Sequence, residues 1–402
     1  MNRIMKNNFF SILIFLLAMF FTFYMTFEGL GAFLNKEMLS LIGLAVDKLS
    51  YRLLAMGVNP AFHSLIIDGV CSGIGSVLSF VPTIAVLFFF ISLMESCGYM
   101  AHIAFILDKY TSKIGLPGEA LVPMLIGFGC SVPAIISTRT IPSRRDKLLT
   151  IFLIPFISCS AKLPVYTIFI SVFFKDSRMA ALLGVYLTGI FIAVIFSLIL
   201  SRTVYRETSD FKKIKCIRAE PKMFKTPSLK FIAANVAGNT FSFVKKAFTV
   251  IFMASIIIWF LQSFDSSLSL TDSSENSLLA FLGKTASPVF APLGFSDWRA
   301  STALIAGLSA KEAVVSTLSV LTCTVSGFSM PEMISQIFTP LSAFAYMIFC
   351  LLYVPCIATM AAIKKETGSI KYVIFAILLQ ITTAWITAFI IFQAGSFICI
   401  VF

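Results

Sequence analysis

The chain has 402 residues, of which 58% are hydrophobic and 12% charged, and it contains 43 Phe. Soluble domains carry roughly 25% charged residues, so this composition excludes a soluble globular protein. The net charge of +12 would suggest nucleic acid in a soluble chain, but in a membrane protein it reports which loops face the cytoplasm. Because the apolar stretches are continuous rather than alternating, we expect an all-α polytopic membrane protein and not a β-barrel.

The first apolar run covers 9–27 and follows Arg3 and Lys6. At about 1.5 Å per residue it is long enough to cross a hydrocarbon core about 30 Å thick. It is too long for the apolar core of a signal peptide, and no small-x-small cleavage site follows, so we interpret it as a membrane span. The further apolar runs are, in order, 77–97, 120–137, 148–174, 179–200, 247–263, 300–325, 341–362 and 372–393.

The charges between these runs indicate the side of the membrane on which each loop lies. The segment 201–230 holds nine basic and three acidic residues, and 137–147 and 363–371 are also basic, so all three should be cytoplasmic. The segment 264–298 holds four acidic residues against Lys284 and should lie outside. Nucleic acid is therefore not needed to explain the basic charge.

Nine simple crossings would place two of the basic loops on the wrong side. The conflict disappears if 120–137 enters from the cytoplasm and turns back, and if 300–325 does the same from the outside. We therefore predict about seven crossings, two oppositely oriented re-entrant or broken helices, and a cytoplasmic N-terminus.

An internal repeat supports this pattern. Placed without a gap over 304–317, the segment 125–138 has five identical residues in fourteen positions, and Gly115 and Gly294 fall at the same offset. Inverted repeats with broken helices are a transporter architecture, in which unwound backbone forms the site near the midplane. We expect an N-terminal transmembrane helix with an extracytoplasmic amphipathic segment, a first repeat, a basic linker, and a second repeat with C-terminal helices, at 1–76, 77–200, 201–246 and 247–402.

Three cysteines lie beside helix-breaking residues inside apolar runs: Cys130, Cys159 and Cys356. Gly and Pro interrupt a helix and expose carbonyl oxygens. Thiolates favour Fe²⁺, Zn²⁺ or Cu⁺ over Mg²⁺ and Ca²⁺, so thiols from three helices can serve as soft ligands. The alternative is that each cysteine is only a small apolar residue at a helix contact. The residues that break the helices around them are Gly127, Gly129, Pro133, Pro155, Pro164 and Pro355.

Four charged side chains fall within the apolar runs: Glu95, Lys162, Lys311 and Glu312. Each costs roughly 2.5–3.5 kcal/mol on membrane-insertion scales and so requires a reason. In a functional interpretation Glu95 and Glu312 line a cation path, with Lys311 beside them in the second broken segment. In the alternative interpretation, acids and bases pair internally and only hold the helices together.

Other chemistry is sparse. The sequence has two histidines in no metal-binding spacing, no G-x-x-x-x-G-K-[ST] string, and an odd number of cysteines without an extracellular cluster. No nucleophile and base pair stands out. We therefore expect a transporter and not an enzyme, with no tightly bound cofactor and no GTP site in this chain.

Several strings resemble the membrane domain of the ferrous iron transporter B (FeoB) family, in order along nearly the whole chain. They include LMESCGYMAHIAFILDKYTSKIGLPG (93–118), GFGCSVPAIISTRT (127–140), SCSAKLPVY (158–166) and YVPCIATMAAIKKETGS (353–369). The strings with the three cysteines are specific to that family, and the two re-entrant segments look like its paired gate (nucleoside-recognition) regions. The resemblance implies Fe²⁺ import across a bacterial cytoplasmic membrane, with these cysteines as candidate iron ligands.

Two departures from the family pattern matter. Members usually carry an N-terminal GTPase, whereas this chain enters its first span by Phe9, so we expect a separate GTPase subunit on the basic cytoplasmic surface of 137–147 and 201–230. Where the family commonly reads Glu-Asp-Ser-Gly-Tyr-Met-Ala-Arg, this chain reads ESCGYMAH (95–102). The change adds Cys97 as a further candidate ligand and alters the expected metal selectivity.

Other functions fit the same sequence. A transporter of a nucleoside-like small solute would rely on Lys311, Glu312 and helix ends rather than on thiols, and another divalent metal could replace Fe²⁺. A non-transporting membrane sensor would move neither substrate. A homo-oligomer is compatible with each of these functions.

Overall fold

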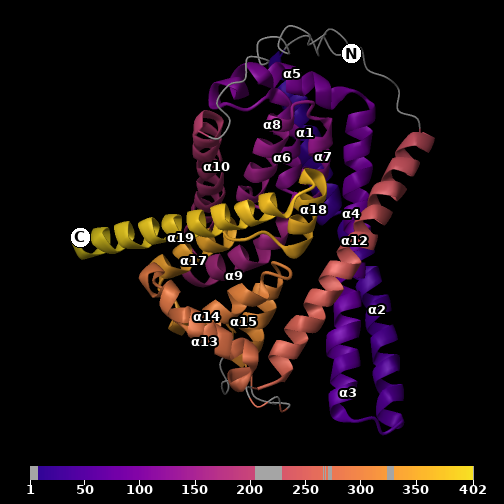
Figure 1. The fold of residues 1–402 in the computed structure, drawn as a ribbon, viewed down its shortest axis with the longest axis vertical. Helices are drawn as coiled ribbons and strands as arrows, with labels where there is room; N and C mark the ends of the chain where they lie inside the picture. The colour runs from indigo at the N-terminus through magenta and orange to yellow at the C-terminus, as the bar shows by residue number, and fades with distance from the viewer. Residues whose placement is uncertain are drawn as a thin grey trace. The chain divides into compact units, whose positions relative to one another are not determined.

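The computed structural model of the chain describes residues 8–203, 229–265, 267, 269, 274–323 and 330–401. Over these residues the chain is helical and forms no strand, apart from one isolated bridge between Asp265 and Ser277. The all-α prediction is therefore confirmed (Figure 1). Most of the basic segment 201–230 falls on 204–228, which lie outside the described residues.

Two compact units make up the fold, and they interleave along the sequence. The first contains 1–126, 136–151 and 195–252, and the second contains 127–135, 152–194 and 253–402. Five helices have residues in both units: α6 (Gly118–Gly127), α7 (Ser131–Ser137), α8 (Arg144–Leu153), α10 (Arg178–Thr203) and α12 (Leu229–Ser263). The sequence-based boundaries at 77, 201 and 247 divide the chain by its expected internal repeat and not by contacts. They therefore stay predictions.

The first unit begins with the N-terminal helices. They are α1 (Asn8–Phe27), α2 (Leu30–Ala55), α3 (Pro60–Ser64), α4 (Ser72–Ser96), α5 (Tyr99–Thr111) and α6 (Gly118–Gly127). A π-helical segment, Leu65–Cys71, leads from α3 into α4. Such wide turns are uncommon and interrupt the regular i to i−4 hydrogen bonds.

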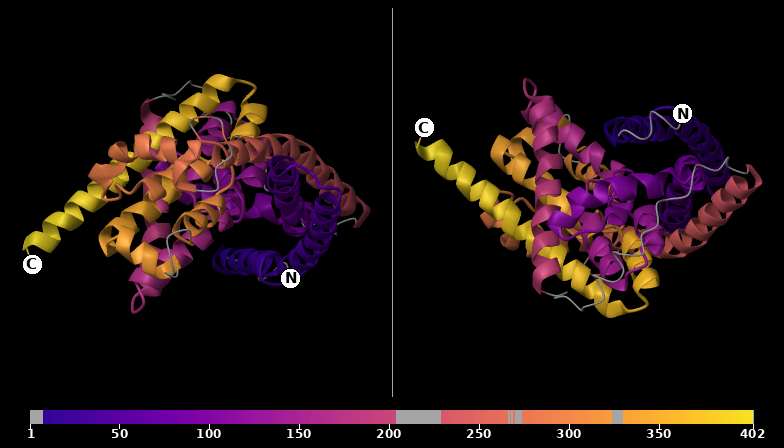
Figure 2. Two further views of the ribbon diagram at one scale, coloured as in Figure 1. Left: turned by 90° about the horizontal axis from the view of Figure 1, so that it is seen from below. Right: turned by 90° about the horizontal axis from the view of Figure 1, so that it is seen from above.

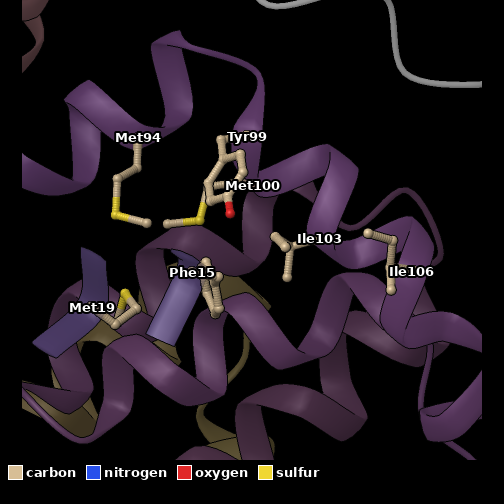
Figure 3. Close-up of a cluster of buried hydrophobic side chains, with 7 residues drawn as sticks. All are labelled: Phe15, Met19, Met94, Tyr99, Met100, Ile103 and Ile106. Carbon is tan, nitrogen blue, oxygen red and sulfur yellow. The ribbon is translucent and has the colours of Figure 1, made fainter. Parts of the chain in front are cut away.

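A buried apolar cluster joins α1, α4 and α5 (Figure 3). Lipid is as apolar as these side chains, so close packing and hydrogen bonding hold the helices together. The Tyr99 hydroxyl donates to the Ser11 carbonyl at 2.7 Å and ties α5 to α1. The cluster therefore holds the segment 95–102 that departs from the family pattern. Its buried members are Phe15, Met19, Met94, Tyr99, Met100, Ile103 and Ile106.

The second unit contains the remaining helices. They are α7 (Ser131–Ser137), α9 (Leu163–Phe173), α13 (Leu278–Phe290), α14 (Trp298–Ala306), α15 (Ala313–Cys323), α16 (Met330–Ile337), α17 (Pro340–Leu352), α18 (Ile357–Thr367) and α19 (Ile370–Val401). The last of these, α19, is one unbroken helix in both views of Figure 2.

The helix α17 is almost fully enclosed within the second unit, as expected for a helix that is apolar on all sides. Its Tyr346 ring packs against Phe169, Phe295 and Phe338, with ring centroids 5.1–5.2 Å away. The Tyr346 hydroxyl donates to the Ala300 carbonyl at 3.3 Å. This aromatic contact fixes the middle of α17, about two turns before the helix breaks.

The described residues contain six helical segments long and apolar enough to span a membrane, or up to seven if one bent pair counts as a span. This agrees with a multi-pass membrane protein of about seven crossings. The run 120–137 falls on α6 and α7 with a break between them, and 300–325 falls on α14 and α15 with another break. The direction from which each enters a membrane stays a prediction.

One segment differs from the sequence-based expectation. We expected 264–298 to be an external loop, but Leu278–Leu293 is helical and forms a bent pair with Trp298–Ala306 at 107°. Acidic residues on both sides of this apolar helix, between 265 and 275 and at 297, made the whole stretch resemble a loop. In the structure α13 packs against α14.

Two glycines bend the chain at corresponding places. Gly115 and Gly294 have φ of +78° and +87°, and each ends a 3₁₀ turn shortly before the next helix, α6 or α14. A side chain is strained at such φ values, whereas glycine is not.

We expect Gly294→Ala to lower the free energy of unfolding by about 1–3 kcal/mol. The added Cβ would be strained at φ +87° and would meet the Phe392 ring. Thermal unfolding of the purified protein in detergent measures the effect. Gly238→Ala in α12 is the control, because no atom lies within 4 Å of its Cβ position, and its Tm should not fall. Equal Tm values for the two variants would contradict the assignment.

Candidate functional site

Four helix breaks fall within the second unit. They cover 128–130 between α6 and α7, 154–162 between α8 and α9, 307–312 between α14 and α15, and 353–356 between α17 and α18. All three cysteines predicted to bind metal lie in these breaks. Each break leaves carbonyl oxygens without their usual intrahelical donors, and in a membrane these need other partners.

The predicted helix-breaking residues lie at or beside these breaks. Gly127 ends α6, Gly129 lies in the first break, and Pro133 falls in the first turn of α7. A proline is tolerated in the first turn of a helix because the amide there has no intrahelical acceptor. Pro164 occupies the same kind of position at the start of α9. The remaining two are Pro155 in the 3₁₀ turn Ile154–Phe156 and Pro355 directly before Cys356.

Backbone hydrogen bonds join the breaks in two similar pairs. The Ser160 amide donates to the Gly129 carbonyl at 3.2 Å, and the Ile357 amide donates to the Leu308 carbonyl at 3.3 Å. Gly129 and Leu308 occupy the same place in the gapless match of the two segments, and each donor directly follows a candidate cysteine. In addition, the Ser160 hydroxyl donates to Gly129 at 2.9 Å. A connection of the same kind therefore occurs twice in the second unit.

The structure brings the three candidate thiols into one region together with Glu312. Cys130, Cys159 and Cys356 are free and partly buried. Cys130 interacts electrostatically with the other two cysteines and with Glu312. The Cys356 sulfur lies 3.1 Å from the Thr359 hydroxyl oxygen, with which it shares a hydrogen bond.

The thiols do not form a closed ligand set. Over the described part of the chain, no group of three or more His, Cys, Asp or Glu side chains is close enough to hold one metal ion. A cation at the thiols would therefore complete its shell with carbonyl oxygens, other side chains or water. Such an open site suits a transported ion more than a structural metal, which is usually enclosed by four protein ligands.

Two buried lysines donate to the carbonyls around the α17–α18 break. The Lys162 Nζ lies 2.6 Å from the Leu351 carbonyl oxygen and 3.5 Å from that of Pro155. The Lys311 Nζ donates to the Val354 carbonyl and lies 3.3 Å from the centroid of the Tyr353 ring. The lysines are 4% and 3% exposed, so the carbonyls and the ring face replace water around their charges.

Within the described part of the chain, the two buried lysines do not form the ion pairs with acidic side chains that the alternative interpretation of the sequence expects. Over the described residues, no carboxylate forms a salt bridge with Lys162 or Lys311. Glu312, next to Lys311 in sequence, is partly buried. The lysine ammonium groups are therefore stabilised by backbone carbonyls rather than by a salt bridge.

Glu95 and Cys97 lie in the first unit, at the C-terminal end of α4. Glu95 is exposed and Cys97 packs against the cluster around Phe15 and Tyr99. Their membership of the same ligand set as the three other cysteines stays a prediction.

Sequence reasoning did not identify Tyr353 and Thr359 as site residues. Tyr353 begins the α17–α18 break, and Thr359 follows Cys356 in the first turn of α18. A hydroxyl three residues after a cysteine at a helix N-terminus is a detectable signal, because that spacing brings the two side chains together on the first turn. The hydrogen bonds that Lys162 and Lys311 donate to carbonyls far away in the sequence could not be predicted, because no local sequence pattern marks them.

A polar pocket of about 530 Å³ lies at the bend between α13 and α14. Lys284 and Arg299 flank the Trp298 ring there, at 5.0 and 5.5 Å from its centroid. Asp297 caps α14 by accepting from the Arg299 amide at 2.7 Å. Besides Lys284, Asp297 and Trp298, the pocket is lined by Ser287, Gly294, Ser296, Gln336 and Ile337.

A family model described as "Gate: Nucleoside recognition" matches residues 77–173 and 244–370. The "Fe(2+) transporter FeoB" of Staphylococcus aureus is 38% identical over 395 residues, which cover 98% of this chain and 58% of that protein. The chain thus spans well under two thirds of the length of this relative. No solved structure matches.

Two further relatives have similar names. The "Fe(2+) transporter FeoB" of Methanocaldococcus jannaschii is 38% identical over 345 residues, covering 84% of this chain and 50% of that protein. The "Fe(2+) transport protein A/Fe(2+) transporter FeoB fusion protein" of Porphyromonas gingivalis is 34% identical over 429 residues, covering 95% of this chain and 50% of that protein.

We expect Lys311→Met to increase the alkylation rate of Cys356 several-fold. The variant removes the ammonium that holds the Val354 carbonyl, two residues before Cys356, so this segment should open more often. Mass spectrometry of the peptide that contains Cys356 gives the rate. Lys284→Met, at the α13–α14 pocket, is the control and should leave the rate unchanged. An unchanged rate in Lys311→Met would mean that the lysine does not restrain the break.

Proposed function

We propose a transport function for this chain, which belongs to the Gate (nucleoside recognition) family: it forms a path for ferrous iron across a membrane. The proposal is supported by relatives named as Fe(2+) transporters that match 98% of the chain. It is also supported by six or seven apolar helices in the described residues. Because the chain spans 58% of the first relative's length, the activity of the whole relative is carried over only as part of this proposal.

The observation that carries the proposal is the gathering of three thiols and a carboxylate at the joined helix breaks. Cys130, Cys159, Cys356 and Glu312 interact there without a disulfide. A mixed sulfur and oxygen set suits Fe²⁺, which is intermediate between soft and hard cations. Mg²⁺ and Ca²⁺ prefer oxygen ligands alone and would bind such a site poorly.

Each group has a defined role in this proposal. The thiols take Fe²⁺ as it sheds part of its hydration shell, and Glu312 adds a negative charge beside them. Lys162 and Lys311 hold the carbonyls of the α17–α18 break in place and keep the Cys356 segment in position. The ligand set stays open, so the ion can leave again, which conduction requires.

Glu95 and Cys97 are proposed as additional groups on the cation path. Glu95 is exposed at the end of α4 and can attract a divalent cation. Cys97 adds a thiol in a segment where the family pattern has none. Both roles rest on the sequence and on local exposure, since the two residues lie in the first unit.

We also propose a GTPase partner, acting on the cytoplasmic side of a bacterial inner membrane with the N-terminus inside. The basic segments 137–147 and 201–230 support this orientation through their charge. Within the first of them, Arg139 and Arg144 are exposed, whereas Arg145 donates to the Ser201 carbonyl at 3.1 Å. The exposed arginines offer a docking surface for an acidic partner, and self-association of the chain is a further option.

We expect Cys130→Ser and Cys356→Ser to abolish Fe²⁺ uptake into proteoliposomes while the protein stays folded. Serine keeps the size of the side chain but removes the thiolate that binds a soft or borderline cation. Radiolabelled Fe²⁺ measures uptake, and size-exclusion chromatography checks folding. Cys71→Ser is the matched control, because this partly buried thiol lies in the first unit, outside the site. Uptake equal to wild type in both variants would exclude the thiols as ligands.

A second candidate is transport of a nucleoside-like solute, favoured by the family description and by the polar pocket at the α13–α14 bend. A single flux assay with Fe²⁺, Mn²⁺, Zn²⁺ and a nucleoside, with and without added GTPase, separates these functions. We expect Fe²⁺ flux to exceed that of the other substrates and to rise when the GTPase and GTP are present. Nucleoside flux that survives replacement of all three thiols would favour the second candidate, and no flux of any substrate would indicate a sensor.

A further inference from the structure

A buried amide in the last helix has no role in the site described above. Gln380 is 0% exposed, and neither its Oε1 nor its Nε2 has a hydrogen-bond partner. The residue lies in the middle of α19, within the apolar segment Ile370–Phe397. A buried polar group is normally paired, and in a membrane an unpaired amide is especially unfavourable, so this side chain calls for a functional explanation.

The face of α19 that carries Gln380 is directed into the protein. Its neighbours on this face are small: Ala376, Ala384 and Ala388 are at most 1% exposed, and Thr383 is 5% exposed. Small residues allow another backbone to approach closely. The amide is therefore the one large polar group on a stripe that packs against protein and not against lipid.

Two contacts of α19, one before and one after Gln380 in the sequence, show which parts of the second unit this helix packs against. The Phe152 ring, at the end of α8, lies 5.1 Å from the Phe375 ring. At the other end, the Gly395 backbone closely approaches the Leu341 side chain at the start of α17. The chain turns at Gly368 between α18 and α19, so α19 runs antiparallel to α17 beside it (Figure 1).

In this antiparallel pairing, Gln380 lies past the position that pairs with the Leu352 end of α17, on the side of the α17–α18 break. Gln380 precedes Gly395 by fifteen residues, and Cys356 follows Leu341 by fifteen. The end of α8 leads directly into the second break, where Pro155 shares the Lys162 ammonium with Leu351 of α17. Along α19, Gln380 therefore lies between Phe375, which contacts Phe152 shortly before the second break, and Gly395, which contacts the start of α17.

The neutral side-chain oxygens described at the site already have partners. The Thr359 hydroxyl shares a hydrogen bond with Cys356, and the Ser160 hydroxyl donates to Gly129. The carbonyls of Leu351 and Val354 already accept from Lys162 and Lys311. A divalent cation at the thiols needs further oxygen ligands as it loses water, and an amide oxygen provides one without adding charge. A neutral ligand also binds more weakly than a carboxylate, which suits an ion that must move on.

We propose that Gln380 is a further substrate-binding residue, whose amide oxygen faces the transported divalent cation at the level of Cys356. The inference rests on the proposed function and adds a residue to its site. It explains why a chain would keep an unpaired amide in the middle of an apolar helix, where leucine would pack without loss.

The test is Gln380→Leu in the full chain, reconstituted in proteoliposomes. Leucine has a similar volume and removes the unpaired amide, so a purely structural role predicts a Tm equal to or above that of wild type with unchanged uptake. Substrate binding predicts the same or higher Tm together with a loss of Fe²⁺ uptake of about tenfold. The control on the same helix is Gln393→Leu, which loses a hydrogen bond to the Pro292 carbonyl and should keep its uptake.

A second variant covers the case in which Gln380→Leu does not fold. Gln380→Glu keeps an oxygen ligand and adds a negative charge, so we expect its KM for Fe²⁺ to fall below that of wild type. A folded Gln380→Leu with wild-type uptake would overturn the proposal, and so would an unchanged KM in Gln380→Glu. If wild type itself moves no Fe²⁺ in the same vesicles, the transport function fails, which distinguishes that failure from an error about Gln380.

Discussion

The need to pair every backbone polar group in an apolar surrounding governs the second unit of this protein. Four helices break there, and each break leaves carbonyls that lipid cannot solvate. The Ser160 and Ile357 amides satisfy two of these carbonyls from neighbouring breaks. Lys162 and Lys311 satisfy others with buried ammonium groups. The breaks therefore stabilise one another, and removing any one of them would leave polar groups unpaired in the next.

This mutual pairing also creates the proposed cation site. A continuous helix hides its carbonyls, whereas a broken helix exposes them and places the next side chain at a new helix N-terminus. Cys356 stands at such an N-terminus, and Cys130 and Cys159 lie in the two breaks that Gly129 and Ser160 connect. The thiols are gathered as a consequence of how the backbone is satisfied, and the lysines hold the carbonyls that surround them.

Much of this arrangement could be predicted from single residues. Glycine and proline beside a cysteine indicated each thiol-bearing break, and the charge of the loops indicated that 120–137 and 300–325 are not simple spans. The helical character of 278–293 was missed, because the acidic residues between 265 and 297 suggest one continuous loop. Gln380 was missed as well, because a single glutamine in an apolar run has no local signal.

The sequence by itself determined the helical membrane class, the positions of the helix breaks and the candidate thiols, because these depend on local hydropathy, charge and backbone preference. Only the tertiary structure decided which carbonyls accept hydrogen bonds from each lysine and which thiols lie near one another. Those contacts join residues far apart in the chain: Lys162 and Leu351 lie 189 positions apart, and Lys311 and Val354 lie 43 apart. No local pattern encodes such pairings, since they result from how whole helices pack.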